Sequence, residues 1–149
     1  MNILDHTQTN LDKKLIFIVE DNETYSRSLK TFIRAHFPSI NEIKSFAIGE
    51  MCVMELERNP NIIIIDYFLN SKYTEANNGF EIIERIKILK PHTNIIVLSS
   101  EENLDVLSHT IKQFDCIYIL KNHTAFNKIK LTITEILDRN EPLIFEPLN

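Results

Sequence analysis

The chain is poor in the residues that several kinds of functional site require. It has 149 residues but only two glycines, Gly49 and Gly79. A Gly-rich phosphate-binding loop is therefore absent, which excludes the dinucleotide-binding and P-loop classes. Its two cysteines, Cys52 and Cys116, lie far apart and lack metal-ligand spacing. We expect them to be reduced core residues of a cytoplasmic protein.

Long apolar runs and basic clusters are also missing. No apolar run of the sequence approaches the ~20 residues needed to cross a bilayer. The N-terminal segment is polar and acidic and has no signal-peptide pattern, so no membrane partner is expected. The net charge is −5, and without a basic stripe we expect no direct contact with nucleic acid.

The sequence does contain a regular alternation of short apolar runs and amphipathic segments. Five such pairs predict an α/β fold, a doubly wound five-stranded parallel sheet with helices on both faces. We assign this domain to residues 14–139, with an N-terminal extension at 1–13 and a C-terminal tail at 140–149. The expected strands are 15–19, 41–46, 62–65, 94–98 and 116–120.

The helices follow from apolar residues at helical spacing. The first begins after Asp21, ends before Pro38 and carries Tyr25, Leu29 and Phe32 on its apolar face. The other helices are expected at 50–58, 79–90, 101–114 and 124–138.

Carboxylates directly follow two of the expected strands. Glu20 and Asp21 follow residues 15–19, and Asp66 follows the isoleucines of 62–65. Because parallel strands place their carboxyl ends at one edge, where open α/β sheets bind ligands, we expect the three carboxylates to converge. Like charges this close need neutralisation, and a hard divalent cation with oxygen ligands is the usual solution. The alternative is that these acids only cap helices or turns.

Two more polar residues continue the pattern, because Ser99 follows the fourth strand and Lys121 follows the fifth. Taken singly, Ser99 is typical of a turn, Lys121 of a solvated lysine and Tyr118 of a core position. Their common place at one end of the sheet is what indicates a site.

With these residues identified, the chain resembles a response-regulator receiver domain, the CheY-like fold of two-component signalling. A single matching stretch would be weak evidence, but five in the family's order are specific. They are IFIVEDN at 16–22, IIIID at 62–66, GFEIIERIK at 79–87, NIIVLSS at 94–100 and YILK at 118–121.

The resemblance implies a nucleophile and a metal site. Asp66 would be the phosphoacceptor. Glu20 and Asp21 would hold Mg²⁺ together with Asp66 and the backbone carbonyl of Phe68. Mg²⁺ prefers such hard oxygen ligands and keeps several waters.

The resemblance also assigns the remaining polar residues. Lys121 would pair with Asp66 at rest and with the phosphoryl group afterwards, and the Ser99 hydroxyl would bond a phosphoryl oxygen. Ser99 moving toward the phosphate would vacate space that Tyr118 then fills, which makes the pair a packing switch.

The function implied is that of a stand-alone receiver rather than an enzyme, catalysing only its own phosphorylation and dephosphorylation. Its donor would be a sensor histidine kinase or a histidine phosphotransfer protein. Output would pass through contacts with an unknown downstream protein, or through a homodimer.

The chain departs from the family pattern near the site. Asn122 follows Lys121, where the family usually has proline in a cis bond. We therefore predict either a trans Lys121–Asn122 bond with a rearranged loop or a strained cis bond. The loop at 67–78 is longer than usual and is expected to cover part of the site. Phe68 is bulky, which predicts shielding of the acyl phosphate and slow dephosphorylation.

Two other functions compete with this interpretation. A receiver-like interaction module would keep the fold without phosphorylation, although the intact Asp66, Lys121 and Ser99 argue against it. A small hydrolase or phosphatase using Asp66 as a catalytic nucleophile would need a second acid or base nearby. The run Asp66-Tyr67-Phe68 has no acid two positions on.

Overall fold

The computed structural model describes residues 13–69, 79–100 and 104–139, and for 104–107 it describes the backbone alone. The N-terminal extension, most of the long loop and the C-terminal tail named above lie outside these residues. The predicted five-stranded parallel sheet is confirmed, with the strand order β2-β1-β3-β4-β5. Its strands are β1 (Leu15–Val19), β2 (Glu42–Phe46), β3 (Ile62–Asp66), β4 (Asn94–Ser99) and β5 (Ile117–Leu120).

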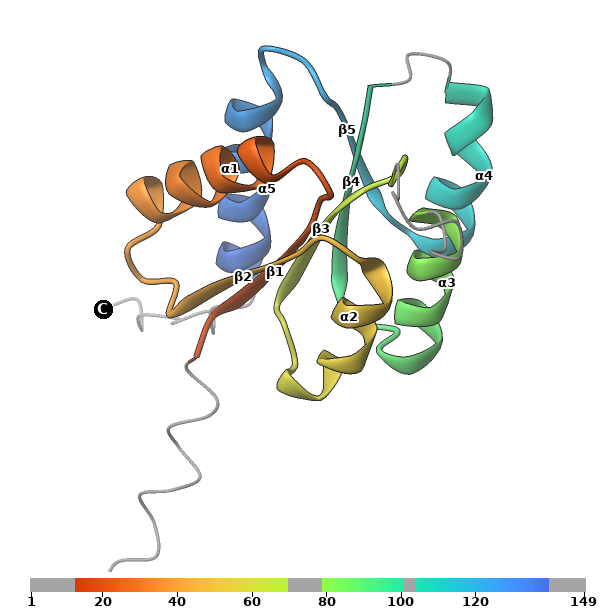
Figure 1. The fold of residues 1–149 in the computed structure, drawn as a ribbon, viewed down its shortest axis with the longest axis horizontal. Coiled ribbons are helices and arrows are strands. Elements are labelled where there is room, and N and C mark those ends of the chain that lie inside the picture. Colours follow the sequence, from red (N-terminus) through yellow and green to blue (C-terminus); the bar gives the residue numbers. More distant parts are fainter. Residues whose placement is uncertain (1–12, 70–78, 101–103, 140–149) are drawn as a thin grey trace, which may run out of the picture.

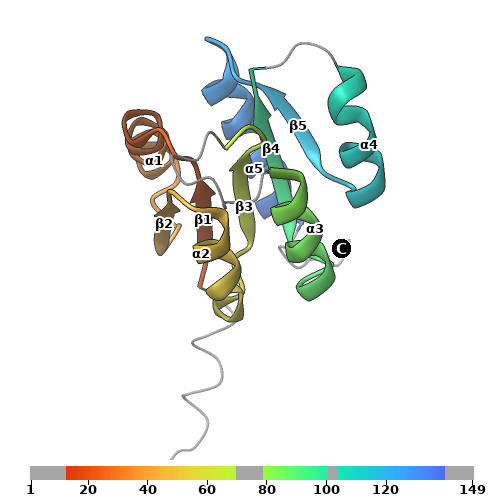
Figure 2. The same cartoon turned by 45° about the vertical axis from the view of Figure 1, so that its right-hand side comes forward.

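Helices cover both faces of the sheet, as predicted (Figures 1 and 2). Two of them, α1 (Glu23–His36) and α5 (Ala125–Arg139), lie on one face, and α2 (Gly49–Met54), α3 (Gly79–Leu89) and α4 (Leu104–Phe114) lie on the other. None of the helices in the described ranges is both long and apolar enough to cross a membrane.

The two faces follow from the alternation of side chains along each strand. Ile64 packs with residues of α1 and α5, whereas its neighbour Ile63 packs with residues of α2 and α3. The continuous apolar runs of β1 and β3 fit this arrangement, because both strands are buried on both sides. Cys52 and Cys116 are buried and free, as predicted for core residues.

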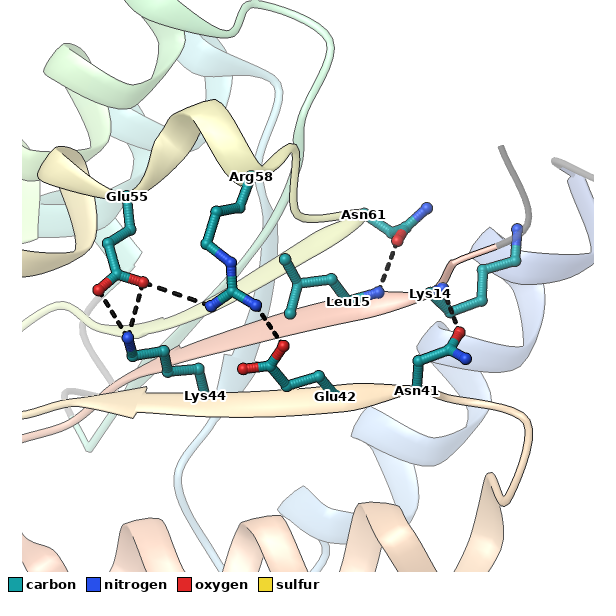
Figure 3. A network of polar contacts seen from close by, with 8 residues as sticks. All are labelled: Lys14, Leu15, Asn41, Glu42, Lys44, Glu55, Arg58 and Asn61. Atoms are coloured by element: carbon teal, nitrogen blue, oxygen red, sulfur yellow. Dashed lines mark hydrogen bonds and ion pairs between the residues drawn. The ribbon is translucent and has the colours of Figure 1, made fainter. Parts of the chain in front are cut away.

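The helix predicted at 50–58 is interrupted in the structure. Helix α2 ends at Met54 and a 3₁₀ turn (Leu56–Arg58) follows, because the amide of Glu55 donates to the carbonyl of Cys52, three residues back. An ion-pair network then joins this turn to the edge strand β2 (Figure 3). Its pairs are Lys44–Glu55 at 2.6 Å, Arg58–Glu55 at 3.4 Å and Arg58–Glu42.

Candidate functional site

The neighbouring strands β1 and β3 bring three carboxylates to one edge of the sheet. Glu20 follows β1, and its amide donates to the carbonyl of Phe46 at 3.0 Å. Asp66 is the last residue of β3. Each of Glu20, Asp21 and Asp66 offers a carboxylate oxygen within 4.8 Å of the other two. Glu20 and Asp66 are only 3% and 7% exposed, so their charges are partly removed from water.

Lys121 lies between two of these carboxylates. Its Nζ is 3.2 Å from Oδ2 of Asp66 and 3.1 Å from Oε2 of Glu20. Its backbone amide donates to the carbonyl of Ser99 at 2.8 Å, which continues the pairing of β4 and β5. The ammonium group thus reaches the site from the far strand of the sheet and bridges β1 and β3.

The turn after Lys121 is built without proline. The Lys121–Asn122 bond is trans, since the described residues contain no cis peptide bond. Oδ1 of Asn122 accepts from the amide and the hydroxyl of Thr124 at 2.9 and 2.7 Å, which leads the chain into α5. Of the two predicted alternatives, the structure shows the trans bond with Lys121 pointing at Asp66.

Burial and neighbouring charges shift the pKa values of Glu20 and Lys121. Burial raises the pKa of Glu20 to about 7, and repulsion from Asp66 adds to this against the opposing effect of Lys121. Burial alone would lower the pKa of Lys121, but attraction to Asp66 and Glu20 outweighs it and raises that pKa. The site thus holds three carboxylates and one ammonium group, which pairs with two of them, and a divalent cation would offset the excess negative charge. Carboxylate oxygens are also the ligands that Mg²⁺ prefers, so these residues fit that ion.

The site opens into a hollow of about 490 Å³. The amide of Phe68 donates to Oδ1 of Asp66 at 3.1 Å, so one Asp66 oxygen faces this turn and the other faces Lys121. Phe68 is 39% exposed and is one of the residues that line the hollow. The hollow is lined by Glu20, Asp21, Asn22, Asp66, Phe68, Ser100 and Lys121.

The residues that line this hollow include neither of the two predicted switch residues, Ser99 and Tyr118. Ser99, the last residue of β4, is completely buried, and it is its neighbour Ser100 that lines the hollow. Tyr118 is half-buried on β5, where its Cα pairs with Val97 of β4. Ser99 pairs with Leu120, two residues after Tyr118, so Ser99 and Tyr118 lie on adjacent strands and on the same side of the sheet.

Sequence reasoning missed Asn22, Tyr25 and Ser100. Asn22 is the N-cap of α1, where its Oδ1 accepts from the amide of Tyr25 at 2.9 Å. An asparagine before a helical pattern is a signal that could have found this cap. The Tyr25 ring lies 4.2 Å from Nζ of Lys121, and no sequence pattern pairs these two residues.

A comparison with protein families identifies the family of this chain. Residues 16–133 match the family model of the response regulator receiver domain. The chain belongs to this family. Receiver domains are phosphoacceptor regulators of two-component signalling rather than classical enzymes. No curated protein matches the chain.

Solved structures share the fold of this receiver domain. The isolated REC domain of RcsB from Salmonella enterica serovar Typhimurium has a TM-score of 0.67 at 20% identity, over 83% of this chain and 89% of that one. A CheY-like receiver protein from Methanospirillum hungatei JF-1 has a TM-score of 0.68 at 23% identity, over 85% and 95%. The RcsB response regulator of Salmonella typhimurium has 0.72 at 17% identity, and the match covers 91% of this chain but 64% of RcsB.

Proposed function

We propose that this receiver domain accepts a phosphoryl group on Asp66 from the phosphohistidine of a sensor histidine kinase or a histidine phosphotransfer protein. The observation that carries the proposal is the bridging of Asp66 and Glu20 by Lys121 within a hollow that contains three carboxylates. Phosphoryl transfer depends mainly on positioning and on charge neutralisation, and this arrangement supplies both.

In the proposed reaction a carboxylate oxygen of Asp66 attacks phosphorus while the P–N bond of the donor breaks. The histidine imidazole leaves, and an acyl phosphate forms on Asp66. Lys121 then shifts from the Asp66 carboxylate to an oxygen of the phosphoryl group. Hydrolysis later releases inorganic phosphate and restores Asp66, so the domain is both the acceptor and the catalyst of its own modification.

Glu20, Asp21 and Asp66, together with the backbone carbonyl of Phe68, would hold Mg²⁺. When bound, the ion supplies positive charge that stabilises the phosphoryl oxygens. The chemistry has a parallel in a similar fold, because the isolated RcsB domain was studied in the presence of the phosphomimetic BeF₃⁻.

Output would begin at Ser99, whose hydroxyl would turn toward the phosphoryl group and make room for Tyr118. Both residues lie on β4 and β5, next to α4 and α5. We infer that this surface contacts a downstream protein or a second copy of the chain. We also infer a cytoplasmic location, where the kinase and phosphotransfer domains of such pathways act.

Incubation with acetyl phosphate and Mg²⁺, followed by intact mass measurement, tests the proposal. We expect a gain of one phosphoryl group, lost in Asp66→Ala and in EDTA but kept in Asp138→Ala, a matched control on the exposed end of α5. No labelling of the wild type would favour the phosphorylation-independent interaction module. Continuous turnover of a small phosphate ester, rather than a single labelling event, would favour a phosphatase.

A further inference from the structure

The ring of Tyr25 contacts the ammonium group of Lys121, which also pairs with Glu20 and Asp66. Nζ of Lys121 lies 4.2 Å from the ring centroid, well inside the ~6 Å over which a cation is attracted to an aromatic face. Tyr25 occupies the first turn of α1, three residues after the Asn22 cap. The turn that carries Glu20 and Asp21 into the site therefore also fixes this ring.

Other aromatic rings hold Tyr25 in place. Its ring meets that of Phe126 edge to face, with the centroids 5.6 Å apart and the planes at 74°. Phe126 in turn lies 5.2 Å from Phe32. Tyr25 and Phe32 belong to α1 and Phe126 belongs to α5, so the ring is wedged between the two helices that cover this face.

The hydroxyl group of Tyr25 does not explain why this residue is present. The oxygen is buried and has no hydrogen-bond partner within the described part of the chain, and a buried unpaired hydroxyl is unfavourable. The part of Tyr25 that the site uses is therefore the ring face, and phenylalanine would supply the same face.

Lys121 needs a contact that persists after phosphorylation as well as before it. Under the proposed function Asp66 takes the phosphoryl group and Glu20 takes the metal ion, so both carboxylates that hold Lys121 at rest change partners. The contact with Tyr25 depends on neither carboxylate. We propose that Tyr25 is a positioning residue, whose ring keeps the Lys121 ammonium group beside the phosphoacceptor when Glu20 and Asp66 change partners.

Nuclear magnetic resonance tests the contact without requiring phosphorylation. A ring face this close shifts the ε-methylene protons of Lys121 upfield, and their signal is identified by its loss in Lys121→Arg. We expect the upfield shift in the wild type and in Tyr25→Phe, and its loss in Tyr25→Leu. The shift should persist when Mg²⁺ and BeF₃⁻ are added. An unshifted signal in the wild type, or loss of the shift with BeF₃⁻, would overturn the proposal.

Labelling by acetyl phosphate supplies the second measurement, and it rests on the proposed function. We expect Tyr25→Leu to slow labelling by about threefold to tenfold, whereas Tyr25→Phe keeps the wild-type rate. Phe32→Leu is the matched control, since it loosens the same aromatic cluster without touching Lys121. Equal slowing in Phe32→Leu would mean that only packing was lost and would overturn the positioning role. If the wild type shows the upfield shift but is never labelled, the proposed function fails while the positioning of Lys121 by Tyr25 stands.

Discussion

Lys121 donates to both carboxylate oxygens of Glu20, at 3.2 and 3.1 Å. Lys121 therefore competes with a metal ion for Glu20, because both are positively charged and both bind the same carboxylate. The resting site is neutralised in part by its own lysine, and binding of a cation must displace or share that interaction.

Replacing Lys121 with methionine should tighten Mg²⁺ binding by roughly threefold to tenfold, because a positive charge next to the site is removed. Isothermal titration calorimetry at low ionic strength measures the change. Lys128→Met, on an exposed part of α5, serves as the control and should leave the affinity as it is. Unchanged or weaker binding in Lys121→Met would contradict this competition.

Phe68 should set the lifetime of the acyl phosphate. Phe68 lines the hollow, and its amide donates to Asp66. Phe68→Asn should lose phosphate severalfold faster than the wild type, because a smaller polar side chain admits water and helps to orient it. Phe68→Leu keeps an apolar cover and should remain slow. The decay of labelled protein is the measurement, and equal rates in all three proteins would refute the shielding.

The ion-pair network on β2 should make the stability of the folded protein depend on pH in the acidic range. The hydrogen bond from Arg58 lowers the pKa of Glu42 below its ordinary value of 4.5. A pKa that is lower in the folded than in the unfolded protein stabilises the folded state at any pH above the unfolded-state pKa. This contribution is lost as the pH falls through the folded-state pKa. Arg58→Gln should therefore lose less stability on acidification than the wild type does.

Melting temperatures between about pH 6 and about pH 3 measure this difference. Arg34→Gln removes an exposed arginine from α1 on the opposite face of the sheet, and it should follow the wild-type curve. The difference should also shrink in high salt, since the network is largely exposed. Parallel curves for Arg58→Gln and the wild type would show that the network contributes nothing.

Gly79 should be intolerant of a side chain. A Cβ at this position would lie 2.5 Å from the carbonyl oxygen of Tyr67 and 2.6 Å from its Cα. These are backbone atoms next to Asp66, so Gly79→Ala should cost about 1–3 kcal/mol in the free energy of unfolding. In Gly49→Ala the nearest atoms to the new Cβ belong to the Ile82 side chain, at 2.5 Å, and a side chain shifts at a lower cost than the backbone does. Urea unfolding should show the smaller loss in Gly49→Ala, and the reverse order would contradict the clash.

Local pattern was sufficient for most of the fold. The isoleucine run at 62–65 and the apolar run at 15–19 predicted strands that the structure confirms, because burial on both faces of a parallel sheet requires continuous apolar residues. The helix at 50–58 was predicted less well. Its interruption at Glu55 depends on hydrogen bonds of the last turn and on ion pairs to β2, which periodicity does not report.

The sequence by itself determined which groups end the strands, and hence that Glu20, Asp21 and Asp66 share one edge of the sheet. Only the tertiary structure decided that Lys121 bridges Glu20 and Asp66, that Tyr25 lies against its ammonium group, and that Ser99 is buried while Ser100 lines the hollow. The reason is physical. The positions of strands and helices along the chain follow from the hydrophobic pattern. Contacts between side chains far apart in sequence depend on the register of β1, β3 and β5 and on how α1 and α5 pack over them.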